Sequence, residues 1–136
     1  MKKFLTISFI ASSLCLIPTA NSFAKWQELG ANDAMTVYVD MDTATAEGDK
    51  AQVMSMLDLK KPGQSPETKE AVNSLVGLNQ YDCSNTTYRP IEFKEFAGNK
   101  GKGKVVSDNK IPDSPFEPVP NGSWTAGVFN VVCPKK

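Results

Sequence analysis

Apolar and polar residues alternate strictly in residues 35–40, and residues 51–60 show the same period of two with a largely apolar face. Alternation with a period of two is typical of half-buried β-strands. Residues 47–50 contain a glycine and three charged residues between the two segments, so they predict a turn. We therefore predict a β-hairpin with a long connection. The residues that share one face of each strand are Met35, Val37 and Val39, followed by Val53, Ser55, Leu57 and Leu59.

Further strands are predicted in the rest of the chain, separated by residues that break strand pairing. Residues 61–66 hold two prolines and a glycine and predict a loop. Residues 84–86 predict a turn, and the four prolines within residues 108–120 predict an extended crossing over the surface. The predicted strands comprise residues 73–83, 88–96 and 104–107, with a short edge strand at 25–29.

The segment from Ser123 to Cys133 fits two kinds of secondary structure. Gly127 and the valines favour a strand, whereas Ser123 is a good helix N-cap and Pro134 a good stop. We predict a helix, because the apolar residues of the segment fall on one helical face. The predicted fold class is α+β, an antiparallel β-sheet with a C-terminal helix.

The first 24 residues have the order of a secretory signal peptide. Two lysines precede an apolar run over residues 4–17, and Pro18 and a small-residue site at residues 22–24 follow. The run is shorter than the roughly 20 residues of a membrane-spanning helix, which argues against an anchor. We predict cleavage between Ala24 and Lys25 and one exported domain, residues 25–136, without a transmembrane helix.

Charge gives no reason to expect a nucleic-acid partner. The chain of 136 residues holds 15 basic and 15 acidic residues. Loss of Lys2 and Lys3 with the signal peptide leaves 13 basic and 15 acidic residues, a net charge of −2.

Two cysteines remain after cleavage, because Cys15 lies in the signal peptide. An even number in an exported chain indicates a disulfide, so we predict a bond between Cys83 and Cys133. The bond would clamp the end of the predicted helix onto the sheet. Closing a loop of this length stabilises the fold by about 4 kcal/mol in the chain-entropy model.

The sequence gives little indication of a catalytic, metal or cofactor site. The chain has no histidine, the commonest general base and a common metal ligand, so we expect no enzyme, no metal and no cofactor. Asp40 and Asp42 are better explained as turn residues than as an acid pair. Met54 and Met56 are better explained by packing than by cuprous ion binding.

Residues 98–104 alternate glycine or asparagine with lysine. Gly98, Gly103 and Lys104 have the spacing of a phosphate loop, but Val105 replaces the serine or threonine that would hold magnesium. We predict instead an adaptable cationic loop in which Lys100, Lys102 and Lys104 contact an acidic partner. The alternative is that these lysines only keep a hairpin tip soluble.

Several short strings carry a family resemblance. In their order, and in the placement of the two cysteines, these strings resemble those of the surface-adhesin protein E family of Gram-negative bacteria. The chain departs from the family pattern at Asp40-Met41, where Asp-Pro is usual, and at Asn121, where proline is usual. The strings, which cover nearly the whole exported part, are Trp26, residues 36–40, Tyr81-Asp82-Cys83, Tyr88-Arg89, Gly98 and Gly103 before two valines, residues 118–123 and Val132-Cys133.

The resemblance implies an antiparallel sheet with a C-terminal helix docked by the disulfide, as the residue pattern also predicts. It further implies binding of host extracellular-matrix or plasma proteins such as vitronectin and laminin, and it brings a homodimer into consideration. We expect an exported, non-enzymatic, adhesin-like binding protein in the periplasm or at the outer surface. The alternative is a periplasmic accessory or inhibitor protein, for instance of lysozyme, without an adhesive role.

Overall fold

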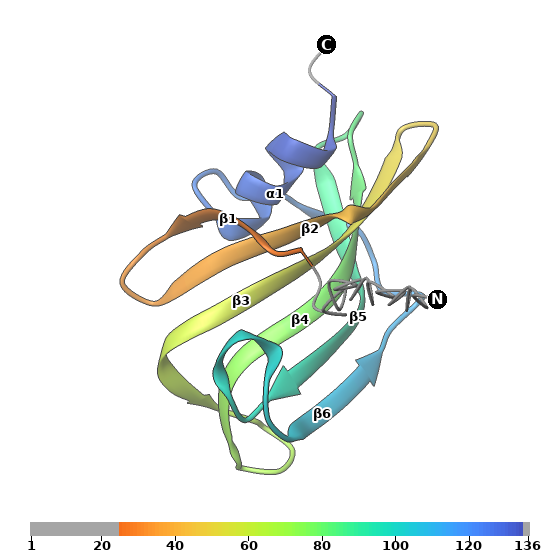
Figure 1. The fold of residues 1–136 in the computed structure, drawn as a ribbon. Helices are drawn as coiled ribbons and strands as arrows, with labels where there is room; N and C mark the ends of the chain where they lie inside the picture. The colour runs from red at the N-terminus through yellow and green to blue at the C-terminus, as the bar shows by residue number, and fades with distance from the viewer. Residues whose placement is uncertain (1–24, 135–136) are drawn as a thin grey trace, which may run out of the picture.

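The computed structural model describes residues 25–134, in which six strands follow one another as an antiparallel meander and a helix lies against one face (Figure 1). A seventh, two-residue strand pairs with β5 beside the meander. The predicted signal peptide, residues 1–24, lies outside the described residues. The elements are β1 (Gln27–Ala31), β2 (Met35–Glu47), β3 (Lys50–Gln64), β4 (Ala71–Asp82), β5 (Thr87–Phe96), the 3-10 turn η1 (Asn99–Gly101), β6 (Val105–Lys110), β7 (Glu117–Pro118) and α1 (Trp124–Val132).

The two faces of the sheet have different covers. Val53 and Tyr81 belong to the face on which α1 packs, which we call the helix-side face. Met56 and Val76 belong to the opposite, loop-side face, because successive side chains of a strand alternate between faces. Gly101 of η1 lies against both of these residues, so the turn covers part of the loop-side face. Each cover excludes water from apolar side chains that a single sheet would leave exposed.

The core lies between the helix-side face and α1. Val39, Val53 and Val128 are fully buried there, as is Tyr81, whose ring centroid lies 6.3 Å from that of Phe129. Burial raises the pKa of the Tyr81 phenol. Its hydroxyl has no hydrogen-bond partner in the described part of the chain. The ring therefore acts as an apolar filler between sheet and helix.

The predicted helix and disulfide are confirmed. The Ser123 side chain accepts a hydrogen bond of 3.1 Å from the Ala126 N–H, which satisfies one of the unpaired donors of the first turn. At the other end, Cys133 is bonded to Cys83, with 5.5 Å between the two Cα atoms. The helix is thus fixed at both ends, by a cap and by a covalent bond to the end of β4.

The first hairpin differs from the prediction in its connection. The long connection is wrong, because β2 continues to Glu47 and only Gly48 and Asp49 separate it from β3. The strand continues through a bulge, where pairing is shifted between Asp40 and Thr45. Gly48 has a φ of 59°, which suits a tight two-residue turn. The bulge breaks the alternation of the sequence without ending the strand.

Residues 61–66 are mostly strand rather than loop. Strand β3 extends to Gln64, which pairs with Ala71 of β4. Pro62 is tolerated because the pairing with β4 is shifted between Asp58 and Gly63, so its missing N–H removes no bond of the ladder. Likewise, part of the predicted crossing at 108–120 is strand, since β6 runs to Lys110.

The Cys83–Cys133 bond gives a prediction for stability. Replacing both cysteines with serine should lower the free energy of unfolding by about 4 kcal/mol, because the unfolded chain loses a closed loop. Urea denaturation measures the change. As a control, a reductant should destabilise the native protein by a similar amount and leave the double serine variant unchanged. Equal unfolding midpoints for the two proteins would contradict the prediction.

Candidate functional site

The lysine loop, residues 98–104, folds back onto the sheet and is held there by two side chains. The Asp58 carboxylate accepts hydrogen bonds from the Asn99 side-chain amide at 2.9 Å and from the Lys100 backbone N–H at 2.8 Å. The Ser74 hydroxyl donates to the Gly98 carbonyl at 2.6 Å and accepts from the Gly101 N–H at 2.9 Å. The loop is therefore anchored, where the sequence predicted an adaptable one.

Two of the loop glycines are required by space and by backbone conformation. A Cβ atom on Gly98 would lie 2.7 Å from the Lys102 carbonyl oxygen, closer than two such atoms approach. Gly101 has a φ of 69° and lies above Met56 and Val76. These glycines let the loop approach the sheet closely, and they do so without making it mobile.

The three lysines of the predicted site have different surroundings. Lys100 and Lys102 are exposed at the tip of the loop. The ammonium group of Lys104 lies 2.6 Å from a carboxylate oxygen of Glu70, and this hydrogen bond lowers the pKa of Glu70. Val105 then begins strand β6, so the loop lacks the helix N-terminus on which a phosphate loop depends.

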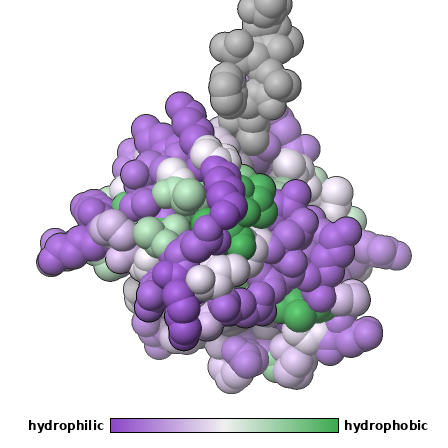
Figure 2. Space-filling model, turned by 90° about the horizontal axis from the view of Figure 1, so that it is seen from below, coloured by the Kyte–Doolittle hydropathy of each residue, from purple (hydrophilic) through white to green (hydrophobic). Residues whose placement is uncertain are grey.

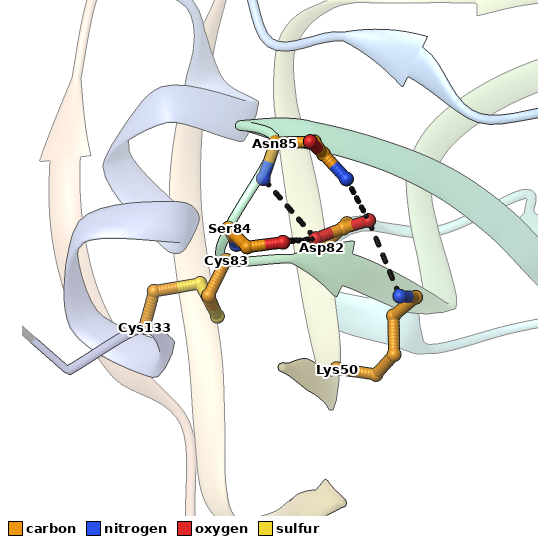
Figure 3. Close-up of a disulfide and its surroundings, with 6 residues drawn as sticks. All are labelled: Lys50, Asp82, Cys83, Ser84, Asn85 and Cys133. Carbon is orange, nitrogen blue, oxygen red and sulfur yellow. Dashed lines mark hydrogen bonds and ion pairs between the residues drawn. A yellow bond between two sulfur atoms is a disulfide. The ribbon is translucent and has the colours of Figure 1, made fainter. Parts of the chain in front are cut away.

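A second polar cluster surrounds the disulfide at the end of β4 (Figure 3). The Asp82 carboxylate accepts hydrogen bonds from the backbone and side chains of Ser84 and Asn85, at 2.8–3.2 Å. Lys50 lies 3.2 Å from the same carboxylate. The hydrogen bonds from Asn85 and Ser84 hold the pKa of Asp82 well below its usual range. The cluster shapes the turn next to Cys83, and it is a structural unit.

The other candidate residues serve packing or local structure. Asp40 accepts a hydrogen bond from the Asp42 N–H at 3.1 Å, inside the β2 bulge. Met56 is 1% exposed beneath the lysine loop, which agrees with a packing role. Within residues 25–134 no group of histidine, cysteine, aspartate and glutamate side chains has a geometry that could hold a metal ion.

A cation–aromatic contact on the loop-side face leaves no signal in the sequence. The Phe116 ring lies 4.7 Å from the Arg89 guanidinium and 5.7 Å from the Lys50 ammonium. This contact fastens the segment between β6 and β7 to the sheet. The three residues are distant in sequence and form no motif, so only the fold brings them together.

Comparison with known proteins identifies the family to which this fold belongs. The profile of the surface-adhesin protein E family matches residues 26–134, from the start of the sheet to the end of the helix. This chain belongs to the surface-adhesin protein E family. No curated protein sequence matches it significantly.

Two solved structures of Haemophilus influenzae protein E show the family fold. The first is 15% identical, covers 87% of this chain and 90% of its own, and has a TM-score of 0.59. The second, from a non-typeable strain, is 15% identical with 87% and 81% coverage and a TM-score of 0.58. At this identity the similarity establishes the sheet-and-helix fold of the family. Within residues 25–134, no helix is long and apolar enough to cross a membrane.

Asp82 gives a prediction for pH dependence. Its lowered pKa means that it stabilises the fold fully above the unfolded carboxyl pKa of about 3.9, and that this contribution is lost as pH falls through the folded pKa. Asp82→Asn should therefore melt at a lower temperature than the native protein at about pH 7, and the difference should shrink below about pH 4. Thermal melts across this range measure it, and a constant difference would contradict the role of the charge.

One glycine of the lysine loop and one of α1 give a matched pair of substitutions. Gly98→Ala should destabilise the protein by about 1–3 kcal/mol, because the added methyl group meets the backbone of Lys102. Gly127→Ala adds the same group inside α1 with no atom within 4 Å, so it should stabilise by about 0.5–1 kcal/mol. Denaturant unfolding compares the two. Equal effects would show that the loop does not need its close approach.

Proposed function

We propose that this chain is an exported, adhesin-like protein that binds other proteins and catalyses no reaction. The observation that carries the proposal is the family match over residues 26–134, which includes the sheet, the lysine loop and the disulfide-bonded helix. The proposed location is the outer cell surface, reached through cleavage of the signal peptide between Ala24 and Lys25. The proposed partners are host extracellular-matrix or plasma proteins such as vitronectin and laminin.

The lysine loop is the proposed contact for an acidic region of such a partner. Lys100 and Lys102 project from a backbone that Asp58 and Ser74 fix to the sheet. A fixed backbone lowers the entropy lost on binding, since fewer conformations have to be given up. The charges are exposed, so their attraction to an acidic surface is screened within about 8 Å at physiological salt. Lys104 contributes to this contact only if a carboxylate of the partner protein takes the place of Glu70 in its ion pair.

The cell location can be tested with intact cells. Protease treatment of intact cells, followed by antibody detection, should remove the protein while a periplasmic marker protein stays intact. Protection of the protein until the outer membrane is opened would contradict a surface adhesin, and would favour the periplasmic accessory or inhibitor role.

The contact can be tested by removing the two exposed charges. Lys100→Gln with Lys102→Gln should weaken binding to immobilised vitronectin, laminin or heparin by about fivefold at low salt, since each exposed contact contributes about 0.5 kcal/mol. The loss should shrink as salt rises. Biolayer interferometry at several salt concentrations measures both.

A matched control removes the same charge elsewhere. Lys25→Gln with Lys110→Gln removes two exposed charges outside residues 98–104 and should leave affinity nearly unchanged. Adding Lys104→Gln to the loop variant also breaks the pair with Glu70, so its thermal stability must be measured alongside binding. Equal affinity of the loop variant and the control would contradict the proposed contact.

A further inference from the structure

The register of β3 and β4 leaves a hollow in the middle of the helix-side face. Ser55 pairs directly with Gly77, and Asn79 is the next residue of β4 on the same face. Leu57 and Leu75 form the next pair, so small and polar residues interrupt an otherwise apolar surface. Gly77 leaves little space for a larger residue, since a Cβ atom there would lie 3.0 Å from the Glu92 carbonyl oxygen and 3.1 Å from the Phe93 Cβ. The result is a hollow of about 180 Å³ next to α1.

The walls of this hollow are apolar, and its floor is polar. Leu57, Leu75, Phe93 and Trp124 surround it. On the floor, the Asn79 side-chain amide donates a hydrogen bond of 3.1 Å to the Ser55 hydroxyl. Asn79 and Ser55 are 5% and 3% exposed, and this bond uses only one amide hydrogen of Asn79 and one lone pair of Ser55. The floor thus offers one hydrogen-bond donor and one acceptor to a ligand.

A second hollow of about 200 Å³ lies on the other side of Phe93 and is acidic. Glu95 and Glu67 line it together with Pro66 and Asn109. Glu95 accepts a hydrogen bond of 2.6 Å from Ser107, and neither carboxylate has a lysine or arginine partner in residues 25–134. No basic residue lines either hollow. We call the two hollows, with Phe93 between them, the Phe93 channel.

Hydrophobic side chains are visible at the surface of this molecule, although most of it is hydrophilic. The view from below in Figure 2 shows a mostly hydrophilic face with a few hydrophobic residues near its centre and toward its lower right. The apolar wall residues Leu57, Leu75 and Phe93 are only partly buried, so they are available to a ligand.

We propose that the Phe93 channel binds an extended peptide segment carrying an apolar side chain and, two residues later, a lysine or arginine. A cavity of about 150 Å³ holds one benzene ring, so the first hollow has room for one side chain. The two carboxylates complement a basic side chain in the second. Both hollows share Phe93 as a wall, and alternate residues of an extended chain point to the same side about 7 Å apart, so one peptide face can present a side chain to each hollow. This inference does not rest on the host-protein proposal, because the lysine loop lies on the opposite face.

Two synthetic peptides are the probes. One is acetyl-tyrosyl-glycyl-lysine amide, and the other has norleucine in place of lysine, which removes the charge and keeps the side-chain length. Titration into ¹⁵N-labelled protein should shift the amide signals of Ser55, Gly77 and Phe93. The lysine peptide should bind about threefold to fivefold more tightly than the norleucine peptide, and the advantage should fall with salt.

Substitutions in each hollow test the assignment with controls of matched chemistry. Leu75→Trp fills the apolar hollow and should weaken binding by about tenfold or more, whereas Leu78→Trp on the loop-side face of the same strand should not. Glu67→Gln with Glu95→Gln should remove the preference for the lysine peptide, whereas Glu28→Gln with Glu92→Gln should keep it. Thermal melts establish that each variant folds.

The outcomes separate this inference from the proposed adhesin function. Peptide binding that Leu75→Trp blocks supports the channel, whatever the lysine-loop variants do to vitronectin or laminin binding. No shift of the channel signals at millimolar peptide overturns the inference. Equal affinity for butylamine and for the lysine peptide also overturns it, because the channel would then recognise an amine alone and not a peptide.

Discussion

The pairing of β3 with β4 is the constraint on which the rest of the structure depends. From Lys50 opposite Asp82 to Asp58 opposite Ser74, the register is continuous. One end of this ladder forms the ion pair beside the disulfide, and the other end supplies both anchors of the lysine loop. The centre, where Ser55 faces Gly77, forms the apolar hollow. A shift of one residue would move every one of these side chains to the wrong face.

The two covers explain how a sheet of this size remains stable. A sheet with a single face buried exposes apolar residues on the other, and here α1 and the lysine loop cover opposite faces. The covers are attached differently. The helix packs Val128 and Phe129 onto the core and carries the disulfide, whereas the loop depends on hydrogen bonds to Asp58 and Ser74. The loop therefore tolerates fewer changes in its backbone than its exposed lysines suggest.

The sequence predicted the fold class because its signals were local. Alternation identified the strands, Ser123 and Pro134 marked the helix, and the count of cysteines gave the bond. The β2 bulge was missed because a bulge breaks the alternation on which strand prediction depends. Pro62 concealed the end of β3, since whether a proline breaks pairing depends on the partner strand. Of the candidate site, the lysines were evident, but Asp58, Ser74 and Glu70 are long-range partners with no local pattern.

The lysine loop and the Phe93 channel have opposite charge and lie on opposite faces of the same central strands. Glu70, which pairs with Lys104, belongs to the same β3–β4 connection as Glu67 of the channel. Both partners of this pair are well exposed, and an exposed ion pair is weak and screened by salt. A partner that takes Lys104 from Glu70 therefore transmits little free energy to the channel. The central strands, which form both surfaces, pair in unbroken register from Lys50 to Asp58, and a change of this ladder would disturb both surfaces at once.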